Sequence, residues 1–144
     1  MSKATLIQQV TLVNEGKIQV TDVLIEGERI QKIGSIPAQD QYHLVDGRGK
    51  YLFPGLIDGQ VHFRDPGLTH KADLTSESKA AIAGGVTSFI EMPNTRPNTL
   101  TLELWADKYE LASSKSLANY GFLLGITADN LDEVIQWDTF KHLA

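Results

Sequence analysis

The sequence predicts an α/β protein in which a small β-domain precedes the beginning of a parallel sheet with its helices. Residues 4 to 36 are rich in β-branched residues and punctuated by turns, whereas from residue 52 onward strand-like runs alternate with helix-like runs. The length of 144 residues and an apolar content of 42% also allow a real core to form. We therefore expect a β-domain over residues 1–51 and three βα units over residues 52–144.

The first part of the chain is typical of an antiparallel meander. Three strands are predicted here, over residues 5–13, 18–27 and 29–34. The stretch "NEGK", residues 14–17, is the predicted turn between the first two strands, because Asn and Gly favour the conformations that a tight turn needs. A meander of this size is too small to bury both of its faces by itself.

The second part of the chain has the order βαβαβα, which is the mark of a parallel sheet. The predicted strands span residues 56–63, 86–92 and 120–127, and the predicted helices span residues 75–83, 100–115 and 130–140. We expect Asp73 or Thr75 to cap the first helix and Thr99 to cap the second. Because a closed (β/α)8 barrel needs about 250 residues, three units would form an incomplete barrel, the first third or so of something longer.

Composition and charge narrow the classes of function. Lys and Arg number 13 against 18 Asp and Glu, and the resulting formal charge of −5 argues against a nucleic-acid-binding surface. The chain has no cysteine, so any transition metal must be held by nitrogen and oxygen ligands. No apolar run approaches the roughly 20 residues that span a bilayer, and the N-terminus has no secretory signal. We therefore expect a cytoplasmic protein with no nucleic-acid or membrane partner.

Polar side chains stand at every second position along the strand predicted over residues 56–63. They are Asp58, Gln60, His62 and Arg64. Since side chains alternate between the faces of a strand, all four would share one face. This face is either solvated, as in a half-exposed strand, or buried in a sheet covered on both sides, where it would need a ligand or a metal. The turn "RDPG" follows at the carboxyl end of the strand, where barrel enzymes carry their chemistry.

Two motifs then point to a family. The stretches are "PGLIDGQVHFRDPG", residues 54–67, and "AAIAGGVTSFIEMPNTRPNT", residues 80–99. Together, and in this order, they resemble the amidohydrolase superfamily, and the dihydroorotases within it. The resemblance implies a small β-sandwich domain followed by a distorted (β/α)8, or TIM, barrel, of which this chain would hold the N-terminal part.

The resemblance also implies roles for individual residues. His62 matches the second of two family histidines that bind a metal, and zinc is the expected metal of the full-length parent. Arg64 and Asn94 match the dihydroorotase pair that holds the substrate carboxylate, and a guanidinium offers a carboxylate a planar, charged fork. The remaining ligands and the catalytic aspartate of the family come from later strands, so we expect no catalytic residue within this chain. The implied partner is a small-molecule substrate with a carboxylate.

Gln60 departs from the family pattern, because it stands where the family has its first metal-binding histidine. An amide oxygen is a weaker zinc ligand than an imidazole, so Gln60 is either a weak ligand or a residue beside the metal. The protein is then either a dihydroorotase variant with an altered ligand or a homologue without the metal that acts as a structural or regulatory subunit. We expect neither lasting zinc binding nor catalysis by these 144 residues alone, since one histidine would not retain the metal.

The implied reaction is the reversible hydrolysis of dihydroorotate, a cyclic amide, to N-carbamoyl-L-aspartate in pyrimidine biosynthesis. Another cyclic amidase, such as an allantoinase or a hydantoinase, is the alternative within the same superfamily. Allantoinases resemble this pattern but usually carry Asn where Arg64 stands. An uncovered sheet edge would favour self-association, so a homo-oligomer is a further prediction.

Overall fold

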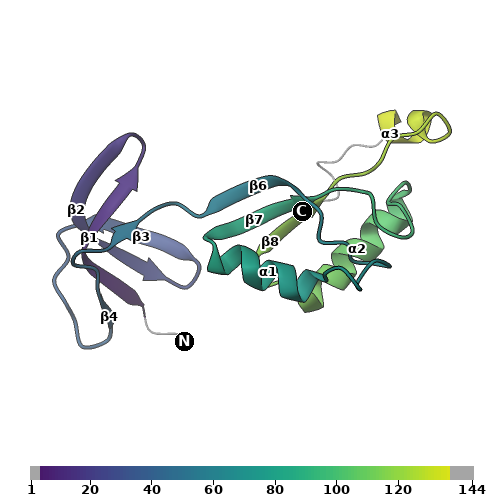
Figure 1. The fold of residues 1–144 in the computed structure, drawn as a ribbon. Coiled ribbons are helices and arrows are strands. Elements are labelled where there is room, and N and C mark those ends of the chain that lie inside the picture. The colour runs from purple at the N-terminus through teal and green to yellow at the C-terminus, as the bar shows by residue number, and fades with distance from the viewer. Residues whose placement is uncertain (1–3, 137–144) are drawn as a thin grey trace. The chain divides into compact units, whose positions relative to one another are not determined.

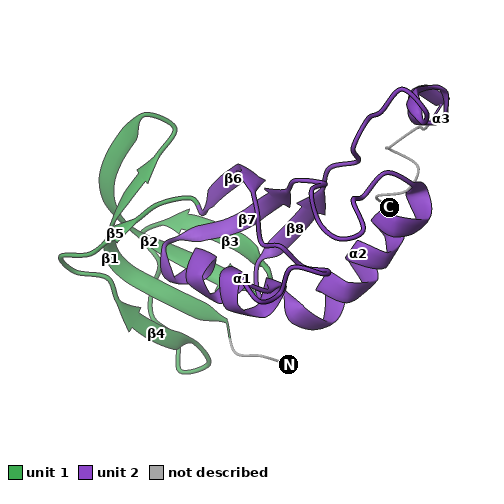
Figure 2. Cartoon of the chain, turned by 45° about the vertical axis from the view of Figure 1, so that its right-hand side comes forward, with its two compact units in different colours: residues 1–54 green, residues 55–144 purple. Residues whose placement is uncertain are grey.

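A computed structural model of the protein describes residues 4–136. The chain divides into two compact units, residues 1–54 and residues 55–144 (Figure 2). The described part of the first unit contains strands, and that of the second contains parallel strands and helices (Figure 1). The helix predicted over residues 130–140 lies partly outside the described residues. Within residues 4–136, no helix has both the length and the apolar character needed to cross a membrane.

The first unit is a five-stranded sheet built around one long strand. Its strands are β1 (Thr5–Asn14), β2 (Lys17–Glu26), β3 (Arg29–Gly34), β4 (His43–Asp46) and β5 (Tyr51–Leu52). The first three form the predicted antiparallel meander, and β4 and β5 both pair in parallel with β1. The turn between β1 and β2 is made by Glu15 and Gly16, whose φ angles of 49° and 72° suit a two-residue hairpin. The sequence pattern did not indicate β4 and β5, because such short strands depend on pairing with β1.

Asp22 holds a bulge in β1. The pairing of β1 with β2 shifts register between Ile7 and Val10, where Gln9 has a positive φ of 52°. One carboxylate oxygen of Asp22 accepts a hydrogen bond from Gln9 N (2.8 Å), and the other accepts one from Ile36 N (3.0 Å). These two hydrogen bonds lower the pKa of Asp22. Asp22 therefore joins the bulge to the segment that follows β3.

The second unit contains three parallel strands in the order β6-β7-β8. Its elements are β6 (Leu56–Val61), α1 (Leu74–Ala83), β7 (Val86–Glu91), α2 (Leu102–Lys115), β8 (Asn119–Phe122) and α3 (Leu131–Gln136). The predicted alternation of strands and helices is confirmed. Strands β6 and β8 end earlier than predicted, at Val61 and Phe122, because the chain leaves the sheet there to form loops. The polar residues of the first motif therefore lie partly in a loop.

Helices α1 and α2 pack against one face of this sheet (Figure 1). The buried residues of this layer are Val61, Phe63, Leu74, Phe89, Trp105, Ala112, Ala118 and Phe122. Val61 and Phe63 lie in this core. Because neighbouring residues of an extended segment point to opposite sides, Gln60 and His62 point away from the helices, and both are exposed. The sequence left this second face open between solvated and buried; residues 4–136 supply no layer over Gln60 and His62.

The N-caps of α1 and α2 agree only in part with the predicted ones. Of the two predicted caps of α1, Asp73 and Thr75, the structure shows Asp73, in a capping box. The prediction of Thr99 as the cap of α2 is wrong, because Thr101 caps this helix by accepting a hydrogen bond from Leu104 N (3.3 Å). Thr99 is buried instead, with its hydroxyl oxygen 3.3 Å from that of Thr95. Both threonines carry the same local cap signal, so burial of Thr99 decided between them.

Replacing Asp22 with alanine is expected to lower the free energy of unfolding by about 1–3 kcal/mol at pH 7, because two main-chain N–H groups lose a charged acceptor. Since the pKa of Asp22 is lowered in the folded state, this contribution is present above the unfolded-state pKa and is lost as the pH falls through the folded-state pKa. Urea unfolding of both proteins at pH 7 and at lower pH measures the difference. Asp40→Ala, in an exposed turn, is the control; equal effects of the two substitutions at pH 7 would contradict the role of Asp22.

Candidate functional site

Polar residues of the two motifs gather at the carboxyl ends of β6 and β7. His62 follows β6 directly, and Asn94 lies three residues beyond Glu91, the last residue of β7. Met92 N donates a hydrogen bond to Val61 O (3.0 Å), so the two strand ends lie side by side. Because parallel strands place their carboxyl ends at the same edge of a sheet, two distant motifs meet there.

A bulge in β6 changes the predicted arrangement of the polar row. Asp58 pairs with Phe89 and Val61 pairs with Glu91, so an advance of three residues on β6 matches two residues on β7. The strict alternation predicted along this strand is therefore wrong. Asp58 turns back toward its own strand, where Oδ1 accepts a hydrogen bond from Gln60 N (3.0 Å). A bulge is defined by the partner strand, so the sequence of β6 alone does not reveal it.

His62 and Asn94 form the side-chain contact that joins the two loops. Nδ1 of His62 lies 3.0 Å from Oδ1 of Asn94, across 32 residues of sequence. Because an amide oxygen can only accept a hydrogen bond, Nδ1 is the donor, and the lone pair of the imidazole is then on Nε2. Both side chains are exposed. With Nδ1 as the donor in this contact, Nε2 of the neutral imidazole is the nitrogen open to a ligand.

Arg64 enters the loop after β6 in a left-handed backbone conformation, with φ at 69°. This conformation is strained for a residue other than glycine. The N–H of Arg64 donates a hydrogen bond to Oε1 of Glu91 (3.0 Å), and the Arg64 residue is half-buried. A charged acceptor makes this hydrogen bond stronger than a neutral one, so Glu91 compensates the strain at Arg64.

The same Glu91 forms a buried ion pair with α2. Its Oε2 lies 2.9 Å from Nζ of Lys108, and the two side chains are 1% and 2% exposed. Burial raises the pKa of Glu91 and lowers the pKa of Lys108, while the attraction between the two charges opposes both changes. Within the described residues, Oε2 of Glu91 makes no hydrogen bond of good geometry, so the ammonium group 2.9 Å away compensates its charge.

The sequence pattern assigned no role to Glu91 or to Lys108. In the structure the Glu91 carboxylate reaches both α2 and the Arg64 backbone. For Lys108 a signal was present in the sequence, because its spacing from Trp105 and Ala112, both buried, places it on the apolar face of α2.

A second ion pair anchors the other side of the same loop. Asp65 is 2% exposed, and its Oδ2 lies 2.8 Å from Nζ of Lys115. The same oxygen accepts a hydrogen bond from Leu74 N (3.3 Å). Asp65 therefore ties the loop after β6 to the beginning of α1 and to the end of α2.

The loops after β6 and β7 also touch through their backbones. Arg96 N donates a hydrogen bond to Pro66 O (3.1 Å). Next to this contact, Gly67 has a φ of 83°, and a Cβ atom added there would overlap the carbonyl group of Arg96. Glycine is thus required at position 67 both by its conformation and by lack of space.

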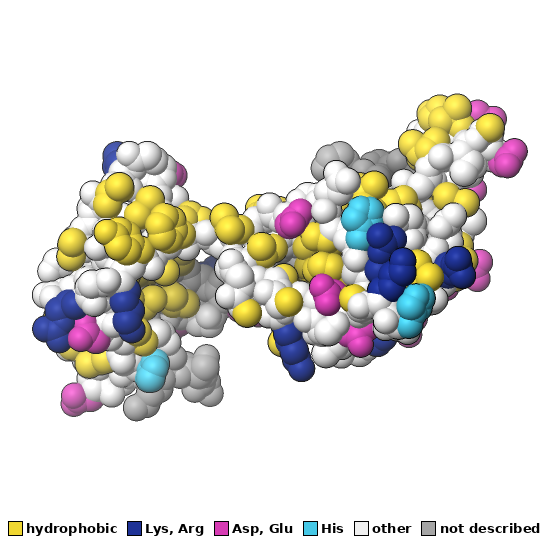
Figure 3. All heavy atoms as spheres, in the orientation of Figure 1, with side chains coloured by type: hydrophobic (Ala, Val, Ile, Leu, Met, Phe, Trp, Pro, Cys, Tyr) yellow, Lys and Arg dark blue, Asp and Glu magenta, His cyan; other side chains and the backbone are white. Residues whose placement is uncertain are grey.

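Basic side chains surround this edge of the sheet. Figure 3 shows Lys, Arg and His side chains gathered on one part of the surface of the second unit. The exposed basic residues of the two loops are His62, His70, Lys71 and Arg96. A concentration of positive charge favours the approach of an anionic ligand.

The described residues do not complete a metal site. Within residues 4–136, no group of three or more His, Cys, Asp or Glu side chains is placed to hold a metal ion. His62 offers one imidazole nitrogen and Gln60 an exposed amide, whereas a catalytic zinc uses three protein ligands. These two residues therefore do not fit a metal by themselves. Metal binding by His62 and Gln60, and carboxylate binding by Arg64 and Asn94, stay predictions.

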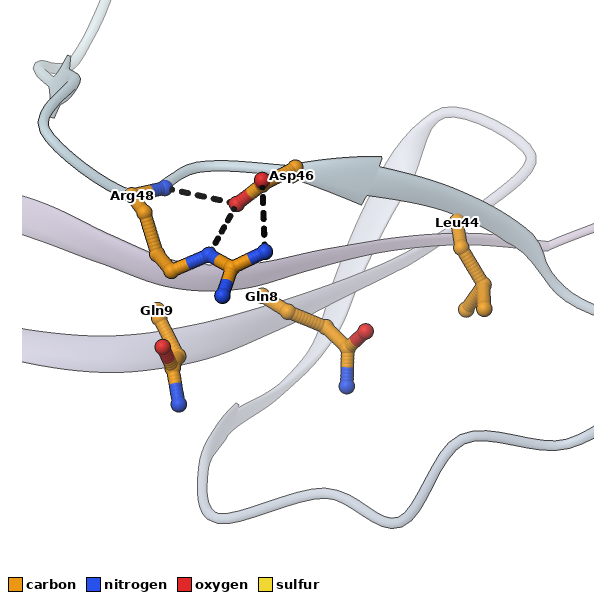
Figure 4. A pocket seen from close by; sticks show the side chains of 5 residues that line it. All are labelled: Gln8, Gln9, Leu44, Asp46 and Arg48. Carbon is orange, nitrogen blue, oxygen red and sulfur yellow. Dashed lines mark hydrogen bonds and ion pairs between the residues drawn. The ribbon is translucent and has the colours of Figure 1, made fainter.

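A separate cavity lies in the first unit, and its charged groups are already paired with each other. It has a volume of about 330 Å³ and is lined by Gln8, Gln9, Leu44, Asp46 and Arg48 (Figure 4). Its two charged groups already pair with each other, because Arg48 Nε and Nη2 each lie 2.9 Å from a carboxylate oxygen of Asp46. This pairing, assisted by the Arg48 N–H, lowers the pKa of Asp46 to about 2. The cavity therefore offers no unpaired charge to a ligand.

The fold and the site together define the class of this protein. Parallel strands alternate with helices, and the residues suited to binding follow the carboxyl ends of the strands, as in enzymes built on a TIM barrel. The chain belongs to the amidohydrolase family, whose family model matches residues 51–135.

Known proteins similar to this chain include three differently named enzymes. The dihydroorotase of Carboxydothermus hydrogenoformans is 46% identical over 102 residues, which cover 69% of this chain and 24% of that protein. The allantoinase of Desulfitobacterium hafniense is 36% identical over 118 residues, covering 81% and 26% of the two chains. The solved structure of the L-hydantoinase (dihydropyrimidinase) from Arthrobacter aurescens matches with a TM-score of 0.83 at 27% identity, over 90% of this chain and 29% of that one.

These similarities confirm the predicted fold class, the N-terminal part of a distorted TIM-barrel amidohydrolase preceded by a small β-domain. They also confirm the resemblance to dihydroorotases. The chain spans about a quarter of the length of these relatives. Because allantoinase and hydantoinase match as well, the similarity does not single out one substrate.

Gly67→Ala is expected to destabilise the protein by more than about 1 kcal/mol, because a Cβ atom would both strain the backbone and push the Arg96 carbonyl away. Thermal or urea unfolding measures the change. Gly59→Ala is the matched control, since a Cβ atom at position 59 meets nothing within 4 Å and no positive φ is involved. If the two substitutions had equal effects, the close contact between the loops would not be needed for stability.

Proposed function

We propose that this chain is the N-terminal part of a metal-dependent, dihydroorotase-like hydrolase of cyclic amides. The observation that carries the proposal is that the loops after β6 and β7, which carry Arg64 and Asn94, meet at one edge of the parallel sheet of an amidohydrolase, where His62 contacts Asn94. The proposed reaction is the reversible hydrolysis of dihydroorotate to N-carbamoyl-L-aspartate, which would place the protein in pyrimidine biosynthesis.

Arg64 is the residue proposed to select an acidic substrate. Its guanidinium can meet a carboxylate in two parallel, charged hydrogen bonds. The amide of Asn94 is the proposed second contact, and it also orients His62. The exposed basic residues around this edge support an anionic ligand, because they favour its approach.

Zinc is the metal proposed for the full-length protein, with His62 as one ligand through Nε2. When bound, such a metal polarises a carbonyl group and lowers the pKa of bound water. The remaining ligands would come from parts of the relatives that this chain does not match. Gln60 is proposed as a weak ligand or a neighbour of the metal.

Two other functions are supported by specific observations. Another cyclic amidase is supported by the similarity to an allantoinase and to a hydantoinase. A structural or regulatory subunit is supported by Gln60, which lacks the imidazole that the family pattern implies. A cytoplasmic location, a homo-oligomeric state and the lack of nucleic-acid and membrane partners stay predictions.

Arg64→Met, in a full-length polypeptide that contains this segment, is expected to raise KM for dihydroorotate at least about tenfold more than KM for the uncharged substrate hydantoin. The physical reason is the loss of the charged fork that would hold the carboxylate. Steady-state kinetics on both substrates measure the ratio. Arg48→Met, which removes an exposed guanidinium from the first unit, is the control. An equal change for both substrates would contradict carboxylate binding by Arg64.

Gln60→His is expected to raise the zinc affinity of the same full-length polypeptide at least about tenfold, because an imidazole is a better zinc ligand than an amide. Zinc retained after dialysis against graded chelator concentrations measures the change, with Gln19→His in the first unit as the control. An increase would support a metal site with one altered ligand. If neither variant retains zinc, the subunit interpretation gains support over the enzyme.

A further inference from the structure

The buried pair of Glu91 and Lys108 is connected to both loops of the site. One carboxylate oxygen of Glu91 faces Nζ of Lys108 at 2.9 Å, and the other accepts the hydrogen bond from Arg64 N at 3.0 Å. Nζ of Lys108 also donates to the carbonyl oxygen of Met92 (3.4 Å), two residues before Asn94. A single ammonium group therefore supports the loop with His62 and Arg64 through Glu91, and the loop with Asn94 through Met92.

Stability alone is a weak explanation for this arrangement. Removing two charges from water is unfavourable, and a buried ion pair often stabilises a protein no more than apolar residues of the same volume would. Lys108 stands between the buried Trp105 and Ala112 on the apolar face of α2, a position where an apolar side chain is usual. Its Nζ lies 4.7 Å from the centre of the Phe122 ring, a contact that favours the charged amine.

The strained backbone of Arg64 explains why Glu91 and Lys108 are charged residues. A left-handed residue other than glycine is maintained only where its surroundings hold it. Two hydrogen bonds hold it: Leu68 N donates to the Arg64 carbonyl oxygen (3.0 Å), and the Arg64 N–H donates to the carboxylate of Glu91. The second of these has a charged acceptor, which needs the ammonium of Lys108 beside it. The conformation of the Arg64 backbone then sets the direction of its Cα–Cβ bond, and so the side of the loop from which the side chain extends.

We propose that Glu91 and Lys108 are positioning residues that hold Arg64 in the conformation needed to bind the carboxylate of an acidic cyclic amide. The inference rests on the proposed function of Arg64 and assigns to the helix layer behind the sheet a part in substrate specificity. Neither residue is expected to touch the substrate, because both side chains are buried on the helix side of β7.

Two double variants isolate the hydrogen bond to Arg64. Glu91→Gln with Lys108→Met removes both charges but keeps an oxygen acceptor for Arg64 N. Glu91→Met with Lys108→Met removes both charges and the acceptor, at similar volume. NMR hydrogen exchange on the 144-residue chain is expected to show the Arg64 amide exchanging about tenfold faster in the second variant than in the first. Equal exchange rates at Arg64 would overturn the inference.

Steady-state kinetics on the full-length polypeptide distinguish a role in substrate binding from a role in stability alone. Relative to the variant with Gln, the variant with Met at position 91 is expected to raise KM for dihydroorotate at least about tenfold more than KM for hydantoin. If Arg64 exchange changes but the two substrates respond equally, the backbone support is upheld and the carboxylate role of Arg64 in the proposed function fails.

If the variant with Met at both positions does not fold, a single substitution still tests the inference. In Glu91→Gln, which retains Lys108, the acceptor for Arg64 N becomes neutral and the hydrogen bond weakens. The amide proton resonance of Arg64 is then expected to move upfield in the NMR spectrum. A resonance that stays in place would overturn the inference.

Discussion

The second unit depends on a buried ion pair between its sheet and its helix layer. Glu91 at the end of β7 and Lys108 in the middle of α2 are almost fully buried, so each requires the other. Their contact fastens the helix layer to the carboxyl edge of the sheet. Through Arg64 N and the Met92 carbonyl group, the same contact reaches the two loops in which the candidate site lies. The packing of α2 on the sheet and the conformation of the two loops therefore depend on the same contact.

The loops themselves are held by contacts of a different kind. Asp65 binds the ends of two helices, Gly67 allows the backbone of Arg96 to approach, and His62 meets Asn94 at the surface. Each contact joins residues that are far apart in sequence. A loop fixed at several points loses little further freedom when a ligand binds, which favours a preorganised site.

Membership of the amidohydrolase family and the glutamine at position 60, where the resemblance implies a histidine, support different functions. The family model and its relatives favour an enzyme, whereas an amide in place of an imidazole weakens one metal contact. Arg64 bears on a separate question, since the proposed function gives its guanidinium the part of distinguishing acidic from uncharged cyclic amides. Under that proposal, metal binding and substrate choice would rest on different residues of the same short segment.

The sequence by itself determined the antiparallel meander, the alternation of strands and helices after it, the hairpin at Glu15 and Gly16 and the family, and it limited the cap of α1 to Asp73 or Thr75, because these follow from local pattern and motif. Tertiary structure decided the bulge after Asp58 and the choice of Thr101 over Thr99 as a cap. It also decided the burial of Lys108 beside Glu91. The physical reason is that register, burial and ion pairing depend on a partner segment, and no stretch of sequence contains its own partner.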